Sequence, residues 1–196
     1  MSDHNRRQGR LPGAPRESFA EKRVRHAEID DPEVVLAAAL RFLEVRQRSV
    51  VEVRRRLTQA GYRSELIEGA IAKLLGLGIL DDAAFAQTWV ESRDRARPRG
   101  ERALRRELQV KGIDRAIVDG SMEARRPEPG GAGDPDMIAA EALMQRHASA
   151  LARIADPRKR RQRAYALLAR HGFDSDIAST VAARVTGHDA PGEEPE

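Results

Sequence analysis

The stretch LTQAGYRSEL, residues 57–66, decides the fold, because two later stretches repeat its pattern. These are LQVKGIDRAI, residues 108–117, and LARHGFDSDI, residues 168–177. Each has a leucine four residues before a glycine, a large apolar residue directly after the glycine, and another apolar residue five after it. Glycine in this place is typical of a helix end, since it readily adopts the left-handed conformation that closes the last turn. The pattern therefore predicts three helix pairs, each packed around a glycine turn.

Outside these stretches the chain also has helical periodicity, with apolar residues recurring at spacings of three and four and aromatic residues making up 4%. Asp-Pro pairs at 31–32, 134–135 and 156–157 mark helix starts, because aspartate caps the first turn and proline needs no N–H there. Ser49 with Glu52 forms a capping box. Further caps are predicted at Ser64, Asp82, Asp114 and Asp174, and a further helix end at Gly187. The predicted helices cover residues 32–46, 50–60, 65–75, 83–96, 100–111, 115–124, 135–151, 157–171 and 175–186.

One helix precedes each glycine-centred pair, so the sequence predicts an all-α protein of three tandem three-helix bundle units in an elongated arrangement. The units are expected at residues 31–80, 81–125 and 134–187. A linker rich in proline and glycine, residues 126–133, is expected to let the third unit move relative to the others. The basic segment 1–30 and the acidic segment 188–196 are expected to be disordered.

Composition excludes several classes of protein. The chain has no cysteine, which rules out disulfides and thiolate metal sites. No apolar run approaches the ~20 residues that span a bilayer, and the polar N-terminal segment lacks the apolar stretch of a signal peptide. We therefore expect a cytoplasmic protein with no membrane partner, and a monomer.

Motifs that carry chemistry are missing from the sequence. The segment GGAG at residue 130 lacks the lysine and hydroxyl residue of a phosphate-binding loop, and neither GxSxG nor HExxH occurs. The adjacent carboxylates Asp81 and Asp82 are interpreted as helix caps, since no further metal ligands lie nearby in sequence. Phe85 and Trp89, four residues apart, are interpreted as core. We expect no catalytic residue, no cofactor and no metal site, so the protein is not an enzyme.

Basic charge is concentrated along particular segments of a chain with net charge +4. Residues 93–111 contain eight basic and three acidic residues, and residues 158–170 contain six basic and none acidic. The arginines after Val53, the basic residues from Arg99 to Lys111 and those from Arg158 to Arg163 fall on the second helix of each unit, which favours a basic stripe that faces an anionic polymer or an acidic protein. The alternative is a set of solvated faces balanced by neighbouring acids. The residues predicted to contact a partner or DNA are Arg54, Arg55, Arg97, Arg99, Arg102, Arg105, Arg106, Lys111, Arg158, Arg160 and Arg161.

The run from residue 48 to residue 93 resembles the RecX family, modulators of the recombinase RecA. The resemblance lies in a serine-started helix at Ser49, the Gly61-Tyr62 pair after a leucine, a long apolar helix, and Leu80-Asp81-Asp82 before Phe85-Ala86. The continuation RPRGERALRRELQVKGID, residues 97–114, is similar to the family's basic segment. The resemblance covers roughly residues 32–122, and the third unit departs more from the family pattern.

This resemblance implies the same fold of three tandem three-helix units and no catalytic residues. It implies a protein that binds the RecA–DNA filament and mainly inhibits strand exchange, filament growth and the linked ATP hydrolysis, with a role in DNA repair, recombination and the SOS response. The alternative function is a RecA-independent DNA-binding protein that meets DNA with its basic helices. Contacts with single- or double-stranded DNA are expected to be weak to moderate and to depend on salt.

Overall fold

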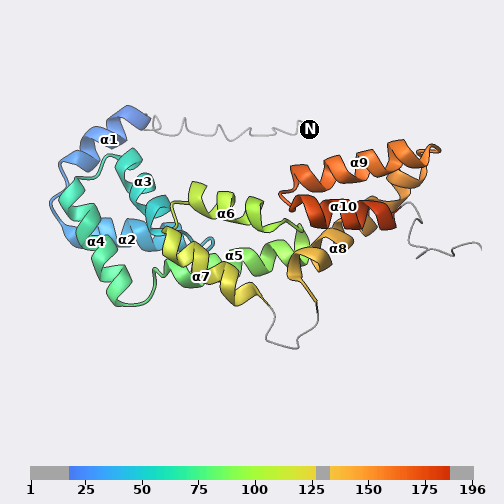
Figure 1. The fold of residues 1–196 in the computed structure, drawn as a ribbon. Helices are drawn as coiled ribbons and strands as arrows, with labels where there is room; N and C mark the ends of the chain where they lie inside the picture. Colours follow the sequence, from blue (N-terminus) through green and yellow to red (C-terminus); the bar gives the residue numbers. More distant parts are fainter. Residues whose placement is uncertain (1–17, 127–132, 186–196) are drawn as a thin grey trace, which may run out of the picture.

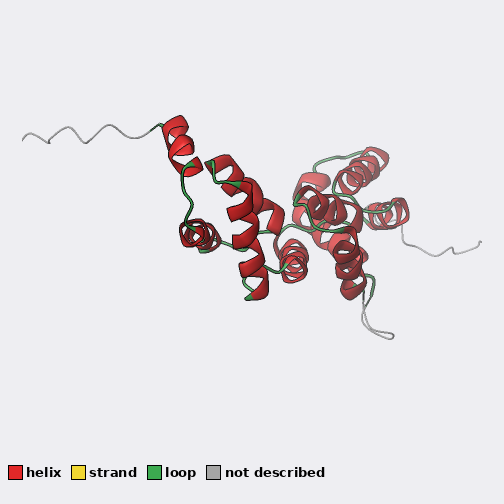
Figure 2. Ribbon diagram, turned by 90° about the vertical axis from the view of Figure 1, so that its left-hand side faces the viewer, coloured by secondary structure: helices red, strands yellow, loops and turns green. Residues whose placement is uncertain are grey.

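The computed structural model describes residues 18–126 and 133–185. These residues form ten α-helices and, within the described ranges, no strand (Figure 2). The prediction of an all-α protein is therefore confirmed. The helices are α1 (Phe19–Ala27), α2 (Pro32–Leu43), α3 (Val50–Ala60), α4 (Ser64–Gly76), α5 (Asp82–Ala96), α6 (Glu101–Val110), α7 (Arg115–Arg125), α8 (Pro135–Ala152), α9 (Pro157–Arg170) and α10 (Ser175–Arg184).

Most predicted helix starts are confirmed. The aspartates of the three Asp-Pro pairs cap α2, α8 and α9, and Ser49 and Glu52 form the capping box of α3. Two predictions were wrong by one residue. Arg63, with no side-chain cap, precedes α4 and leaves Ser64 as its first helical residue, while Asp81 caps α5 in place of Asp82.

The three repeat glycines end their helices as predicted. Gly61, Gly112 and Gly172 have φ values of 99°, 78° and 84°, a conformation that side-chain-bearing residues rarely adopt. In each case the apolar residue after the glycine donates its backbone N–H to the leucine four residues before the glycine, which closes the turn. The predicted helix end at Gly187 lies outside the described residues.

Each group of three helices encloses its own apolar core. The core of α2–α4 is built on side chains such as Val53, Leu57 and Leu74. A second core lies within α5–α7, and a third, rich in alanine, within α8–α10. Phe85 is buried as expected, whereas Trp89 is only half-buried. The three groups, here called units one to three, follow one another in an elongated row (Figure 1).

The same contact joins every unit to the element before it. The preceding element lies against the repeat glycine so closely that an added Cβ would come within 3.0 Å of Arg23 at Gly61, of Val51 at Gly112, and of Ala103 at Gly172. The carbonyl just before each glycine also accepts a hydrogen bond from that preceding element. The pairs are His26 Nδ1 with Ala60 O at 2.8 Å, Ser49 Oγ with Lys111 O at 2.6 Å, and Gly100 N with His171 O at 3.1 Å.

Helix α1 corrects the expectation of disorder over residues 1–30. Ser18 and Glu21 form a capping box for it, although it buries none of its own residues. It covers the Gly61 turn of unit one, in the place that the preceding unit's second helix takes at the later turns. The rest of that expectation, residues 1–17, and the acidic segment 188–196 lie outside the described residues.

Units two and three are joined by more than the covalent linker. Arg125, at the end of α7, has a side chain only 7% exposed and binds both Asp94 on α5 and Asp136 on α8. Asp136 also accepts the backbone N–H of Glu101 at 2.9 Å. Arg146 on α8 donates to backbone carbonyls at the end of α5. The structure therefore packs unit three against unit two, where the sequence indicated a flexible connection through residues 126–133.

Candidate partner-binding surface

The second helices of the units, α3, α6 and α9, lie along the same side of the row, the upper side in Figure 1. Each buries two apolar side chains one turn apart, of which Leu57, Leu104, Leu108 and Leu168 are at most 2% exposed. Packing of these residues against the unit's own core directs the remaining faces of the helices outward. This arrangement places the arginine-rich parts of the sequence on one side of the molecule.

On α3, the two predicted arginines differ in their state. Arg54 holds Glu68 of α4 with two hydrogen bonds of 2.6 and 2.8 Å, and this pairing raises the pKa of Arg54. Arg55 is exposed and has no hydrogen-bond or ion-pair partner in the described part of the chain. Arg55 is therefore free to meet a ligand, while Arg54 is neutralised within its unit.

On α6, most of the predicted cations are engaged inside the protein. Arg105 binds Glu101 at 2.7 Å and also Asp119, which raises its pKa, and only 32% of its side chain is exposed. Arg102 is exposed but forms an ion pair with Asp174 of unit three. Of the three predicted contact residues Arg102, Arg105 and Arg106, only Arg106 is therefore exposed and without an ion-pair partner among the described residues.

Lys111 and Arg99 are also occupied. Lys111 donates to Glu52 of unit one at 2.7 Å and lies 4.9 Å from the centre of the Trp89 ring. Arg99 lies 3.5 Å from Glu107, the carboxylate that also binds Arg93 and Trp89. Arg99 and Arg93 thus join α6 to α5, and Lys111 joins unit two to unit one. For this part of the predicted stripe, the structure therefore favours the alternative in which neighbouring acids balance the basic charge.

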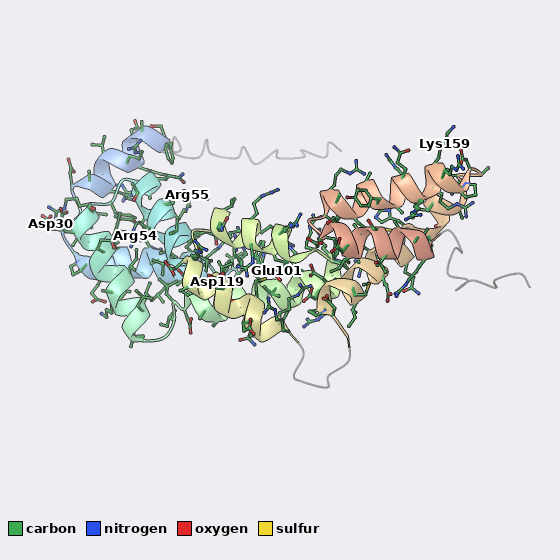
Figure 3. All side chains as sticks on the ribbon, viewed as in Figure 1. Asp30, Arg54, Arg55, Glu101, Asp119 and Lys159 are labelled. Atoms are coloured by element: carbon green, nitrogen blue, oxygen red, sulfur yellow. The ribbon has the colours of Figure 1, made fainter. Side chains whose placement is uncertain are left out.

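On α9 the charge is more open. Arg158 and Arg161 are exposed without ion-pair partners among the described residues, whereas Arg160 donates to Ile154 O at 3.0 Å. Figure 3 shows Arg55 on α3 and Lys159 on α9 on the upper side of the row. The free arginines of the predicted set, across residues 18–126 and 133–185, are Arg55, Arg97, Arg106, Arg158 and Arg161.

Asp82 has a role that the sequence reading missed. It accepts the backbone N–H of Val50 at 2.9 Å, so it links the start of α5 to the start of α3. Burial raises the pKa of Asp82, against the effect of that hydrogen bond. Arg125 and Arg146 were likewise missed, because their partners lie 11 to 51 residues away and no local pattern marks such pairs.

The described residues contain no group of three or more histidines and carboxylates that could hold a metal ion. Among these same residues, no helix has both the length and the apolar character to cross a membrane. What the fold and the surface define is a class: a tandem array of three-helix units that presents unpaired arginines along its second helices.

Comparison with known proteins gives this class a family. Models of the first, second and third three-helix domains of RecX match residues 36–74, 81–122 and 136–181. The chain is 33% identical over 156 residues to the regulatory protein RecX of Streptomyces coelicolor, covering 78% of this chain and 77% of that protein. It is 30% identical to the regulatory protein RecX of Mycobacterium avium, covering 74% of this chain and 80% of that protein. The chain belongs to the RecX family of regulatory proteins.

Other comparisons extend over different lengths. The match with the regulatory protein RecX of Mycolicibacterium vanbaalenii, 36% identical, spans about half of that protein, 47% of its length, and 44% of this chain. The crystal structure of RecX from Lactobacillus salivarius superimposes with a TM-score of 0.66 at 22% identity, covering 80% of this chain and 97% of that one. That structural likeness confirms the fold of tandem three-helix units.

Proposed function

We propose that this protein binds the RecA filament on DNA and restrains strand exchange, filament growth and the linked ATP hydrolysis. The observation that carries the proposal is the shared side of α3, α6 and α9, where each helix or its leading turn contributes at least one free arginine. Membership of the RecX family supports the choice of RecA as the partner. The helices of 10 to 14 residues are each ~15–21 Å long, so the row spans on the order of 50 Å.

A row of this length contacts more than one subunit of a helical filament. Each unit adds a modest contact, and their connection raises the overall affinity because the second and third contacts form at high effective concentration. The free arginines are attracted both to phosphates and to acidic protein surface. Bound in this way, the protein bridges neighbouring subunits and obstructs incoming duplex DNA or the next RecA monomer.

The test replaces one free arginine per unit with glutamine, at Arg55, Arg106 and Arg161. We expect weaker inhibition of RecA strand exchange and weaker filament binding, with helicity unchanged because these side chains are exposed. The matched control makes the same change of charge at exposed cations outside the second helices, namely Lys73, Arg115 and Arg126. Equal inhibition by the two triple variants would refute the role of the second helices.

DNA binding without RecA is the second candidate, because unpaired arginines attract phosphates whatever else is present. Five free arginines on single-stranded DNA predict a slope of log K against log salt of about −3.5, and the triple glutamine variant lowers it by about 2. Measuring binding to DNA with and without RecA and nucleotide separates the two functions. A requirement for RecA together with a shallow slope supports the filament, and tight RecA-independent binding with the full slope supports DNA alone.

A further inference from the structure

Unit one has a hollow that the proposed function does not use. It has a volume of about 380 Å³ and lies between α1, α2 and α3. Three aromatic rings line it, from His26, Phe42 and Tyr62, together with the two exposed arginines Arg41 and Arg56. Within the described residues, no aspartate or glutamate lines this hollow. Its walls therefore suit a ligand that is flat and negatively charged.

The aromatic rings of this hollow belong only partly to the core, because Phe42 and Tyr62 pack against the core of unit one with one side only. Phe42 and Tyr62 are half-buried, whereas Phe85 and Phe173 of the other units are 4% and 2% exposed. Tyr62 stacks on His26 with ring centres 4.4 Å apart and planes 7° from parallel. These rings thus line a hollow between α1, α2 and α3, the helices that Figure 1 shows at one end of the row.

Arginine groups already lie over the remaining ring. The guanidinium of Arg48 lies 4.3 Å from the centre of Phe42, and that of Arg56 lies 5.8 Å from it. Across residues 18–126 and 133–185, neither Arg41 nor Arg56 forms an ion pair with a carboxylate. Aromatic faces next to unpaired arginines are the combination with which proteins hold stacked bases and their phosphates.

His26 supplies a directional group. Its Nδ1 lies 2.8 Å from Ala60 O, and because a carbonyl can only accept, Nδ1 carries the proton. In the neutral ring, Nε2 is then an acceptor, and it has no partner in the part of the chain that the structure describes. A base amino group can donate to this nitrogen.

We propose that the hollow binds an unpaired base of single-stranded nucleic acid, with the adjoining phosphates on Arg41 and Arg56. A duplex fits less well, because its bases are stacked and paired and cannot reach the rings. An acidic peptide matches the charge but leaves the aromatic surface unused. Arg56 belongs to α3, but the site uses none of the eleven cations predicted from the sequence to contact a partner, and it requires no RecA.

The experiment uses the full chain, without RecA, and two single-stranded oligonucleotides of equal length. One consists of thymidines with a central 2-aminopurine, and the other is abasic throughout. We expect the base-containing strand to bind about fivefold more tightly or better, with the 2-aminopurine fluorescence changed by stacking. Equal affinity for the two strands, or tighter binding of a duplex of the same length, would overturn the proposal. The proposal would also be overturned if poly-glutamate displaced the strand equally well from the parent protein and from the ring variants described next.

Variants locate the site. Phe42→Leu and Tyr62→Leu keep apolar bulk but remove the rings, and we expect them to abolish the preference for bases while leaving abasic binding within twofold. If either variant loses helicity, His26→Ala gives the answer, because α1 buries no residue and its ring can be removed without opening the core. Arg106→Gln is the control, which lowers binding of both strands equally. If all three variants, at His26, Phe42 and Tyr62, still prefer the base-containing strand over the abasic strand, the proposed site is wrong. That outcome would leave the test of filament binding unaffected.

Discussion

The substitution Gly100→Ser should have two opposite effects on stability, a better cap for α6 and a clash with unit three. Gly100 caps α6 with φ −75° and ψ 160°, a conformation open to any residue, and serine is a better helix cap than glycine by a few tenths of a kcal/mol. Ser49 holds the corresponding place in unit one. Local sequence reasoning therefore expects a small gain in stability.

The close contact between units two and three leads us to expect a loss of stability instead. A Cβ on Gly100 would lie 2.3 Å from the carbonyl oxygen of Gly172 and 2.5 Å from the Cα of Phe173. Ordinary contact begins at 3.4 Å, so unit three must move by about 1 Å, which breaks the hydrogen bond from Gly100 N to His171 O. Overpacking costs about 1–3 kcal/mol and the lost hydrogen bond about 1 kcal/mol, so we expect a net loss of about 2–3 kcal/mol.

The assays are urea unfolding followed by circular dichroism and trypsin cleavage at Arg125, whose buried side chain is released when the junction opens. Gly100→Ser should unfold at lower urea and be cut faster at Arg125. The control is Gly120→Ala on α7, where an added Cβ meets nothing within 4 Å and the expected effect is a gain of about 0.5–1 kcal/mol. Unchanged or increased stability of Gly100→Ser, with Arg125 still protected, would refute the close backbone contact.

Three further predictions concern the junctions. Gly112→Val places a Cβ 2.5 Å from Val51 and forces a β-branched residue to positive φ, so we expect a loss of about 3 kcal/mol or more in thermal unfolding, beyond the 1–2 kcal/mol of the backbone effect alone. Burial raises the pKa of Glu52, but hydrogen bonds from Lys111 and Arg46 outweigh this and hold it below its ordinary value. The ionised Glu52 therefore stabilises the fold above its pKa in the unfolded chain, near 4.5, and this contribution is lost as pH falls through its lower pKa in the folded state. The difference in unfolding free energy between the parent and Glu52→Gln should therefore shrink from pH 7 to pH 3. A difference that stays constant with pH would contradict the assignment. Arg125→Ala leaves two carboxylates without their buried cation and should cost about 3–5 kcal/mol, whereas Arg126→Ala next to it should change stability by less than about 1 kcal/mol.

The parts of the fold that the sequence predicted depend on local chemistry. A capping aspartate before proline and a glycine after a helix act within one turn, so the starts of α2, α8 and α9 and the three glycine turns could be placed from a few residues each. Helix α1 was missed because it is only nine residues long and its two large apolar side chains, Phe19 and Val24, are exposed and belong to no core. Its capping box, Ser18 with Glu21, was present in the sequence and was the pattern that could have located it.

The candidate surface was predicted less well, because ion pairing is not a local property. Arg54 and Arg105 find carboxylates 14 residues away, and Arg102 finds one 72 residues away on another unit. Counting charges along a helix cannot reveal such partners. Five of the eleven predicted cations, Arg55, Arg97, Arg106, Arg158 and Arg161, are free among the described residues, so the stripe is narrower than the sequence suggested.

The repeated junction has a consequence for how far such an array can extend. The first turns of α3 and α6 present Val51 and Ala103 to the next glycine turn, small side chains that can lie against bare backbone. The first turn of α9 instead exposes Arg158 and Lys159, whose charges would have to be stripped of water to take the same place. At the opposite end, α1 already covers the Gly61 turn. With one end charged and the other end closed, we expect that copies of the molecule do not join head to tail into open-ended fibres.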